Sequence, residues 1–365
     1  MSRHFPAPPS LAPGAPAPAA ATGRPLRWGI VSTGAIAATM AGEIALLEDA
    51  QLQAVSSRSQ ESADAFAAEH GIARGYGGAD DLSGLQRMAA DPDVDVAYIG
   101  SPHSEHAADA EVLLEAGKHV LCEKAFTVTA AQARRLADVA RANDRFLMEA
   151  VWTRFQPGSN RVWDLVADGA VGDVRWMSSD MGFVADAPPE HRLWKRELAG
   201  GALLDLGPYS TLWPLTVLGR PEHVTASGLL TEGGVDAQEA ITLEFSGGRH
   251  AHVTNALNAF GPRALHVAGT EGWLRAGPNL HRVTEVTVQR PGEDPHTELF
   301  DDRPTGDATA QGRGYVWQLR EVTRCIQEGL TESPTMPLAD SIASMELFDA
   351  VREQLGLRYP ADDDA

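Results

Sequence analysis

The chain has 365 residues, 43% of them hydrophobic and 22% charged, which are ordinary values for a globular protein with room for two domains. A formal net charge of -20 argues against nucleic acid or an anionic membrane as a partner, because phosphates bind to basic surfaces. The two cysteines, Cys122 and Cys325, lie in apolar segments and argue against a disulfide framework or a cysteine-based zinc site. No apolar run reaches the 18 or more residues that a membrane span needs.

Residues 1–25 are rich in proline and alanine. Proline interrupts the hydrophobic stretch of a signal peptide, and no twin arginine is present, so we expect a cytoplasmic location. We expect this segment to be a disordered or polyproline-like arm. The alternative is an ordered arm that embraces a neighbouring subunit.

Strand and helix patterns alternate over residues 26–150. Apolar runs predict the strands, and segments with helical spacing follow them, two of which stop at Gly71 and Gly117. The expected strands cover 26–32, 52–57, 94–100, 118–124 and 145–150, and the expected helices cover 35–47, 59–71, 104–117 and 129–143. This alternation is typical of crossover connections, so we predict an α/β domain with a parallel Rossmann sheet.

The pattern changes over residues 151–365. A helix over 157–169 is followed by alternating runs whose turns carry Gly-Gly, Gly-Thr and Pro-Gly. The runs cover 174–183, 223–231, 239–248, 249–257, 264–274 and 283–290, and two helices, 314–329 and 338–356, close the chain. We therefore predict a second, α+β domain with a largely antiparallel open sheet.

The stretch "RWGIVSTGAIAATM" starts at Arg27 and leads from the first strand into a glycine turn. Ser32, Thr33, Gly34, Ala35 and Ile36 align with the dinucleotide fingerprint G-x-G-x-x-G/A, with serine in place of the first glycine. A serine can make this tight turn if its φ is negative. The helix after Gly34 would direct its N-terminus at phosphates, although a strand, turn and helix with one glycine also occur without a ligand.

The end of the second strand carries Ser57 and Arg58, where an NAD enzyme usually has an acid for the ribose hydroxyls. Hydroxyls and an arginine suit a 2′-phosphate, so we predict that NADP(H) is preferred, with NAD(H) as the alternative. An N-capping serine and a surface arginine would explain the same residues without a ligand.

The segment "YIGSPHSEHAADAEVLLEAGKHVLCEKA" carries a specific resemblance to a known protein family. Its order of strand, Ser-Pro-His-x-x-His, helix and "GKHVLCEK" resembles the Gfo/Idh/MocA oxidoreductases, the glucose–fructose oxidoreductase and inositol dehydrogenase family. The stretches "WGIVSTG", "MEAVWTRFQP" and "GGALLDLGPYS" most resemble the branch with dimeric dihydrodiol dehydrogenase and NADP-dependent xylose dehydrogenase. The resemblance implies that the cofactor also lies against Ser101, Pro102, His103, His106, Glu123 and Lys124. Capping and packing would account equally for the two histidines.

The family motif Glu-Lys-Pro appears here as Glu123-Lys124-Ala125. The resemblance places Lys124 at the carboxyl end of a parallel strand, and it leaves open whether the peptide before Ala125 is trans or is held cis by its surroundings. A second family motif places catalytic residues at Asp205 and Tyr209, which share one face if the segment is helical. We expect the Lys124 ammonium to favour the Tyr209 phenolate, so that Tyr209 acts as the acid/base. Without the family, a solvated ion pair and a core tyrosine would be the simpler interpretations.

Four further residues are expected to wall the substrate pocket: Trp152, Arg154, Phe155 and Trp194. Core packing or a domain interface would account for them equally. The twelve histidines show no metal-binding spacing, so we predict no metal.

Together these features predict an NADP-dependent oxidoreductase that acts on a secondary alcohol or hemiacetal of a sugar, polyol or cyclic trans-diol. One alternative is a sugar–sugar oxidoreductase that keeps its cofactor, and another is a non-catalytic NADP-binding regulator on the same fold. A one-sided sheet leaves a face to be covered, and the resemblance implies a homodimer or homotetramer formed through it.

Overall fold

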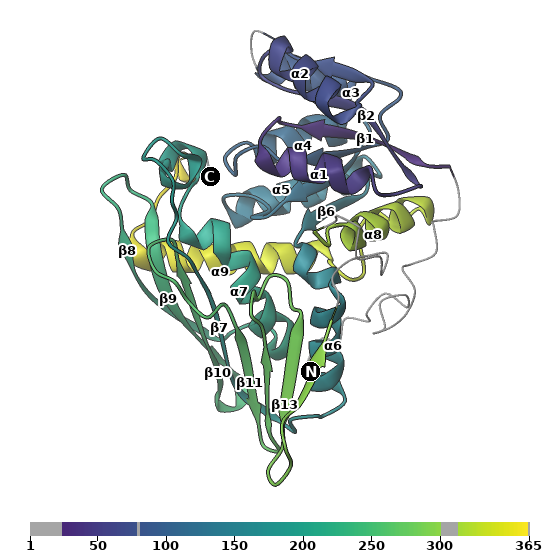
Figure 1. The fold of residues 1–365 in the computed structure, drawn as a ribbon. Coiled ribbons are helices and arrows are strands. Elements are labelled where there is room, and N and C mark those ends of the chain that lie inside the picture. Colours follow the sequence, from purple (N-terminus) through teal and green to yellow (C-terminus); the bar gives the residue numbers. More distant parts are fainter. Residues whose placement is uncertain (1–23, 79–80, 301–312, 364–365) are drawn as a thin grey trace.

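The computed structural model describes residues 24–78, 81–300 and 313–363, and Figure 1 shows their arrangement. The expectation for the N-terminal arm therefore falls outside the described residues, except at its last two positions. There Arg24 donates to both oxygens of the Asp95 carboxylate, at 2.7 and 2.6 Å. Within the described ranges no helix has the length and apolar character that crossing a membrane would require.

Six parallel strands form the first sheet, in the order β3-β2-β1-β4-β5-β6. They are β1 (Leu26–Val31), β2 (Ala50–Ser56), β3 (Arg74–Tyr76), β4 (Val96–Ile99), β5 (His119–Glu123) and β6 (Leu147–Ala150). The carboxyl ends of β1, β2, β4 and β5 meet at one edge, which is where ligands bind in open parallel sheets. The prediction of a parallel Rossmann sheet is confirmed.

Five helices connect these strands: α1 (Ala35–Ile44), α2 (Gln60–His70), α3 (Asp81–Ala89), α4 (His106–Glu115) and α5 (Ala130–Ala142). Gly71 and Gly117, with φ of 65° and 78°, lie just past α2 and α4 as predicted. Strand β3 and helix α3 were not predicted from the sequence. Three residues are too few to show a period, and Gly84 interrupts the helical pattern of α3.

Eight strands form the second sheet, in the order β14-β13-β12-β11-β7-β10-β9-β8, and only β7 and β10 run parallel. They are β7 (Val174–Gly182), β8 (His223–Leu230), β9 (Asp236–Phe245), β10 (Arg249–Ala256), β11 (Leu265–Gly269), β12 (Trp273–Ala276), β13 (Glu285–Gln289) and β14 (His296–Leu299). The largely antiparallel sheet is confirmed. The short edge strand β14 was not predicted.

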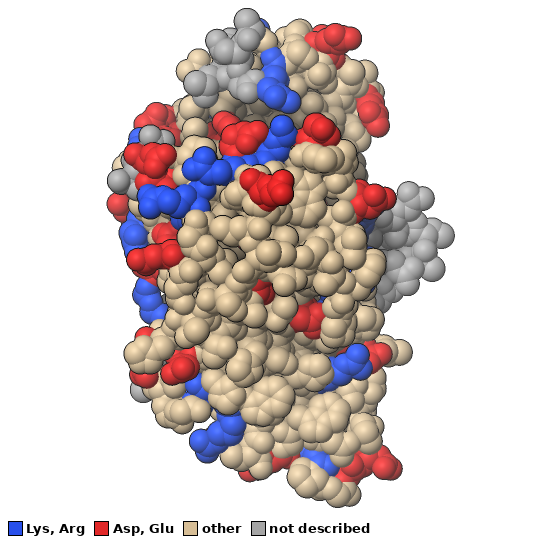
Figure 2. Space-filling model, turned by 90° about the vertical axis from the view of Figure 1, so that its left-hand side faces the viewer, with Lys and Arg blue, Asp and Glu red and all other residues tan. Residues whose placement is uncertain are grey.

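Four longer helices belong to this half of the chain: α6 (Pro157–Ala167), α7 (Ala202–Leu218), α8 (Val316–Gln327) and α9 (Leu338–Leu355). Helix α7 packs on β7, β9 and β10, and α9 packs on β8, so both cover the same face of the sheet (Figure 1). Among the described residues no helix covers the opposite face. Figure 2 looks at the molecule from the side of β8 and β9 and shows a broad area with few charged side chains.

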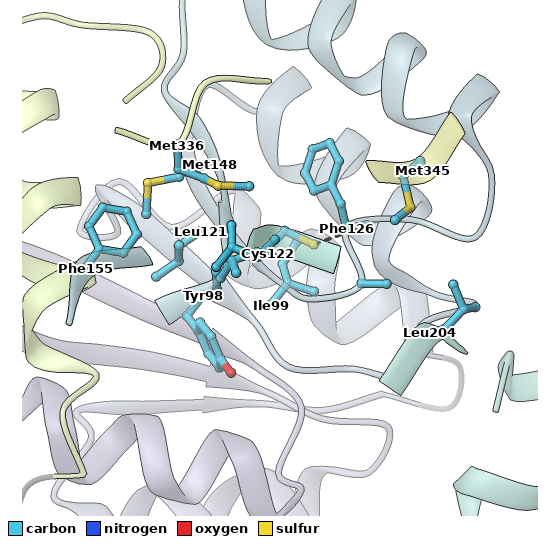
Figure 3. Packing of buried hydrophobic residues seen from close by; sticks show 14 of the residues in the cluster. Tyr98, Ile99, Leu121, Cys122, Phe126, Met148, Phe155, Leu204, Met336 and Met345 are labelled. Carbon is cyan, nitrogen blue, oxygen red and sulfur yellow. Dashed lines mark hydrogen bonds between the residues drawn. The ribbon is translucent and has the colours of Figure 1, made fainter. Parts of the chain in front are cut away.

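The last two helices return to the first sheet. The Thr331 carbonyl, between α8 and α9, accepts a hydrogen bond from the Leu147 backbone at 3.1 Å, and the Asp349 carboxylate of α9 accepts one from the Ala130 backbone at 2.9 Å. One hydrophobic core runs through both halves. Figure 3 shows part of it, with side chains of the first sheet packed near Met336 and Met345.

Candidate active site

The turn between β1 and α1 forms an uncapped helix N-terminus. Gly34 is the N-cap of α1 and supplies no side-chain cap, and a Cβ added to it would meet only Ser32 Oγ, at 3.4 Å. This open space beside free backbone N–H groups fits a phosphate. Ser32 has a φ of 88°, so the negative φ expected for a serine here is wrong, and its Oγ accepts the Gly34 N–H at 3.1 Å. That bond offsets part of the cost of a left-handed serine.

The end of β2 lies beside this turn. Thr33 Oγ1 and Ser57 Oγ are 3.3 Å apart, and the Arg58 side chain is exposed and forms no ion pair among the described residues. Ser59, one residue further on, caps α2 by accepting the Ser62 N–H at 3.1 Å. The capping role therefore belongs to Ser59, while Ser57 contacts the turn through Thr33.

The loop between β4 and α4 is held by two buried histidines. His106 places Nδ1 2.9 Å from the Ala125 carbonyl and Nε2 3.0 Å from the Ser101 carbonyl, while His103 Nδ1 lies 2.8 Å from the Ala199 carbonyl. Burial lowers the pKa of His103 to about 3 and that of His106 to about 4, so both are neutral near pH 7. They join strand ends and the second half of the chain. Pro102, between Ser101 and His103, accepts the Glu105 N–H at 2.9 Å and starts the turn into α4.

The end of β5 carries Glu123 and Lys124. One oxygen of the buried Glu123 carboxyl accepts the Tyr98 hydroxyl at 2.7 Å, and the other accepts the Lys124 N–H at 3.1 Å. Burial raises the pKa of Glu123. The peptide bond between Lys124 and Ala125 is cis, which answers the question that the missing proline left open.

Lys124, Asp205 and Tyr209 meet where β5 faces α7. Lys124 Nζ donates to the Asp205 carbonyl at 2.6 Å and lies 3.4 Å from Asp205 Oδ1 and 4.9 Å from the centre of the Tyr209 ring. Asp205 and Tyr209 are both on α7, and their i, i+4 spacing places them on the side of the helix that faces Lys124. Although burial opposes ionisation, Lys124 and Arg192 hold the pKa of Asp205 well below its ordinary value.

Tyr209 is a half-buried, neutral phenol. The Trp152 indole N–H donates to Tyr209 Oη at 3.1 Å. Burial raises the pKa of Tyr209 above its usual value, and the charge on Glu123 adds to the shift. The pKa of Tyr209 is raised although the Lys124 ammonium lies 4.9 Å from the centre of its ring.

Three residues near the trio carry no motif and were not predicted. Arg192, in the short 3-10 helix Arg192–Trp194, bonds to Asp205 Oδ1 at 3.1 Å. The His281 ring lies 5.5 Å from the Tyr209 ring, and Tyr315 stacks on Trp152 at 4.2 Å. The only sequence signal near Arg192 is the His-x-Leu-Trp run, from which Trp194 was predicted as a site residue and Arg192 was not.

The four residues expected to line the substrate pocket lie in different surroundings. Trp152 touches Tyr209, as described above, and belongs to the site. Arg154 is 3% exposed and bonds to Asp340, Thr216 and the Thr335 carbonyl. Phe155 is fully buried among core side chains (Figure 3), and the Trp194 indole bonds to the Ala187 carbonyl at 3.2 Å. Core packing, the alternative for these residues, describes Arg154 and Phe155.

Within the part of the chain that the structure describes, no three His, Cys, Asp or Glu side chains gather into a group that would ligate a metal. The arrangement instead offers an anion-binding turn at one end and a lysine, an acid and a phenol at the other. A nicotinamide dinucleotide is a group with phosphates at one end and a hydride-carrying ring at the other, so these residues fit it.

Known proteins show the same design. Trans-1,2-dihydrobenzene-1,2-diol dehydrogenase from Bos taurus is 35% identical over 341 residues, which cover 92% of this chain and 99% of that protein. The crystal structure of aldose-aldose oxidoreductase from Caulobacter crescentus, complexed with glycerol, has a TM-score of 0.79 at 27% identity and covers 91% of this chain and 97% of its own. Levoglucosan dehydrogenase in complex with NADH and L-sorbose shares the fold, with a TM-score of 0.79 at 19% identity over 92% of this chain and 97% of its own.

Two family models match most of the chain. Residues 26–151 match an oxidoreductase family with an NAD-binding Rossmann fold, and residues 160–275 match the C-terminal domain of the same family. These matches agree with the order of the two sheets along the chain. The chain is an oxidoreductase and belongs to the Gfo/Idh/MocA family.

Proposed function

We propose that this oxidoreductase transfers a hydride between NADP(H) and a secondary alcohol or hemiacetal carbon of a sugar, a polyol or a cyclic trans-diol. The observation that carries the proposal is the contact of Lys124 with Asp205 and with the Tyr209 ring at the carboxyl edge of the parallel sheet. The substrate class is supported by the names of a diol-dehydrogenase relative and an aldose-oxidoreductase neighbour.

The chain offers a cradle for the cofactor. Backbone N–H groups after Gly34 would hold the pyrophosphate, and the loop around Ser101 and Glu123 would lie beside the ring. The bound nicotinamide accepts the hydride in oxidation and supplies it in reduction. Lys124 and Asp205 would orient the reacting hydroxyl, because Lys124 Nζ lies 3.4 Å from Asp205 Oδ1 and 4.9 Å from the centre of the Tyr209 ring.

Tyr209 would move the proton. In reduction, the neutral phenol donates its proton to the oxygen that gains charge as the hydride reaches carbon. In oxidation, the phenolate takes the hydroxyl proton while the hydride leaves carbon. The raised pKa of Tyr209 favours the first direction, and the Lys124 ammonium beside the ring stabilises the phenolate that the second requires.

The preference for NADP(H) rests on Ser57 and Arg58. No acid stands at the end of β2, Thr33 and Ser57 present two hydroxyls 3.3 Å apart, and Arg58 is free of carboxylates among the described residues. A guanidinium and hydroxyls bind a 2′-phosphate well, whereas the ribose of NAD is usually held by a carboxylate.

A sugar–sugar oxidoreductase with a retained cofactor is a second candidate. It is favoured by the likeness to the aldose-aldose oxidoreductase, which covers nearly the full length of both chains. Protein purified without added cofactor distinguishes the two, because a retained cofactor shows nicotinamide absorbance and turnover with two sugars alone.

We further propose that two or more copies pair through the helix-free face of the second sheet. Figure 2 shows few charges over this area in a chain whose net charge is -20. Side chains on this face, paired in register across neighbouring strands, include Trp176, Ala240, Thr242, His250, His252 and Thr254. A monomeric mass by light scattering at micromolar concentration would contradict this interface.

A spectrophotometric screen tests the function directly. Sugars, inositols and trans-dihydrodiols are supplied with NADP+ or NAD+, and reduction of the nicotinamide is followed. We expect turnover with NADP+ and at least one of these alcohols. The absence of turnover with every alcohol, in both directions and with both cofactors, would support the non-catalytic regulator instead.

A further inference from the structure

Two acids lie on the far side of α7 from the cofactor. Asp236 and Glu239, both on β9, are 0% and 1% exposed. Residues three apart on a strand ordinarily face opposite sides. Here the pairing of β8 with β9 shifts register between Leu229 and Leu230, and the irregularity accompanies the burial of both acids beneath α7.

Asp236 caps α7. The N-cap residue, Gly201, has no side chain, and Asp236 Oδ2 accepts the Leu203 N–H at 2.6 Å. A Cβ added to Gly201 would lie 2.0 Å from Asp236 Oδ1, so the carboxylate occupies the space that a capping side chain would need. A carboxylate at a helix N-terminus also interacts favourably with the helix dipole.

Glu239 reaches the same helix two turns later. Its Oε1 accepts the Asn255 side-chain N–H at 2.6 Å, and Asn255 Oδ1 accepts the Ser210 hydroxyl at 2.7 Å. Ser210 is the residue after Tyr209. The two acids therefore contact α7 on both sides of the segment that carries Asp205 and Tyr209.

One oxygen of each acid is left without a hydrogen-bond partner among the described residues. These atoms, Asp236 Oδ1 and Glu239 Oε2, are shielded from solvent, and the two carboxyl groups interact with each other. The titratable neighbour is Tyr359, whose hydroxyl bonds to the Gly200 carbonyl and whose ring lies beneath Arg352, a guanidinium already paired with Asp349 and Asp362. Two bare carboxylates at such a place would repel each other, and a single proton removes the repulsion and supplies the missing bond.

We propose that Asp236 and Glu239 share one proton and act as positioning residues, holding α7 so that Asp205 and Tyr209 face Lys124. The proton belongs with Glu239, because Asp236 already accepts from the helix N-terminus. This inference rests on the proposed function only where it speaks of catalysis; the shared proton stands independently of it.

Burial raises the pKa of both acids, and the charge of Asp236 raises the pKa of Glu239 further. These shifts decide the sign of the pH dependence of stability. A group whose pKa is raised by folding stabilises the protein below its unfolded value, about 4.3 for glutamate, and that contribution is lost as the pH rises toward the folded pKa. Above that pH the two charges push against each other under the N-terminus of α7.

Glu239→Gln tests whether the two acids share a proton. The amide oxygen still accepts from Asn255, and the amide N–H replaces the shared proton toward Asp236 with no group left to titrate. Glu115→Gln, an exposed glutamate of α4, is the matched control. Urea unfolding from pH 5 to pH 9 should show wild type and Glu115→Gln losing stability relative to Glu239→Gln as the pH rises. Parallel curves for all three proteins would overturn the shared proton.

Glu239→Leu tests positioning, because it removes both bonds and keeps the bulk. With NADP+ and D-xylose or trans-cyclohexane-1,2-diol, we expect kcat to fall on the order of ten- to a hundredfold while the KM for NADP+ stays unchanged. Glu239→Gln should keep kcat within about twofold at pH 7. A Glu239→Leu enzyme with full kcat, or a Glu239→Gln enzyme as impaired as Glu239→Leu, would overturn the positioning role.

If Glu239→Leu does not fold, Ser210→Ala removes the link to Asn255, together with the longer hydrogen bond of the same hydroxyl to the Gly207 carbonyl at 3.2 Å. A lower kcat with an unchanged KM for NADP+ then supports positioning, and a full kcat overturns it. An inactive wild type, or full kcat in Tyr209→Phe, would overturn the proposed function alone. The unfolding curves need no substrate and still decide whether the proton is shared.

Discussion

The two ends of the active site differ in how they are built. At the phosphate end, Ser32, Gly34 and Ser57 lie at the tips of two neighbouring strands, partly open to solvent and joined by short-range hydrogen bonds. At the chemical end, Lys124 and Tyr209 come from segments 85 positions apart and are largely enclosed. The first end depends on local backbone geometry and the second on burial and charge, so substitutions at the two ends should change different quantities.

The largest effect is expected at the chemical end. Tyr209→Phe keeps the ring and removes the transferable proton, so kcat should fall about 10²–10⁴-fold while NADPH binding stays near that of wild type. Lys124→Met should also lower kcat and should move the basic limb of oxidation to higher pH, because the phenolate loses a stabilising charge. The double variant should be little worse than the poorer single one, since the two groups act as a unit.

Tyr76→Phe is the matched control, because its hydroxyl bonds to Asp91 at 2.9 Å, away from the trio. Steady-state kinetics and NADPH fluorescence titration give both readouts. Full kcat in Tyr209→Phe would remove Tyr209 from the mechanism and make Asp205 or His103 the next proton carrier to test.

At the phosphate end, Arg58→Ala should change cofactor choice and leave the chemistry intact. The KM for NADP+ should rise about ten- to a hundredfold, the equivalent of a charge-assisted hydrogen bond of ~1.5–3 kcal/mol, while the KM for NAD+ barely changes. Arg141→Ala, an exposed arginine of α5, is the control. Equal losses with both cofactors would show that Arg58 does not hold a phosphate.

A buried carboxyl group behind the chemical end of the site, that of Glu149, should make the stability of the protein depend on pH. Glu149, at the end of β6, is 1% exposed and accepts the Phe126 N–H at 3.0 Å, and burial raises its pKa to about 7. Because the folded state holds this proton more tightly, the stability it contributes is present below about pH 4.3 and is lost as the pH rises to about 7, at up to about 1.4 kcal/mol per pH unit. Glu149→Gln should flatten this slope in urea unfolding, and the exposed Glu115→Gln should not. Identical slopes in wild type and Glu149→Gln would refute the raised pKa.

The smallest effect is expected at the serine that replaces a fingerprint glycine. Ser32→Ala loses the hydrogen bond to Gly34 and keeps the left-handed φ, so it should destabilise the protein by ~0.5–1.5 kcal/mol. Ser32→Gly loses the same bond but relieves a backbone cost of ~1–2 kcal/mol, so it should be nearly neutral. Urea unfolding compares the two, and a glycine variant less stable than the alanine variant would contradict this account.

The same contrast explains what could be predicted from sequence. The strands and helices around Gly34 and Gly71 are specified by local periods and by caps, so they were found. Helix α7 is not specified by local sequence signals, because Pro208 and Pro214 lie inside it, and its nearly complete burial explains why it is helical nonetheless. The direction of the Tyr209 pKa depends on enclosure and on Glu123, and neither can be read from a motif.

Arg192 and His281 illustrate the limit at the chemical end. Each is a single charged or aromatic residue outside the long helices and strands, without a repeating pattern or a spacing to its partner. Their proximity to Asp205 and Tyr209 arises from tertiary packing within the second half of the chain. A single sequence contains no local signal for such a contact.

The return of α8 and α9 to the first sheet has a consequence for exchanging parts between relatives. Leu147 on the edge strand β6 and Ala130 at the start of α5 are satisfied by Thr331 and Asp349, near the other end of the chain. On the opposite side of the sheet, Glu43 of α1 accepts the Tyr315 N–H at 3.1 Å. A chimera joined near residue 150 would therefore pair each cofactor half with foreign helices, so the unit to transplant is the Rossmann half together with residues 313–355.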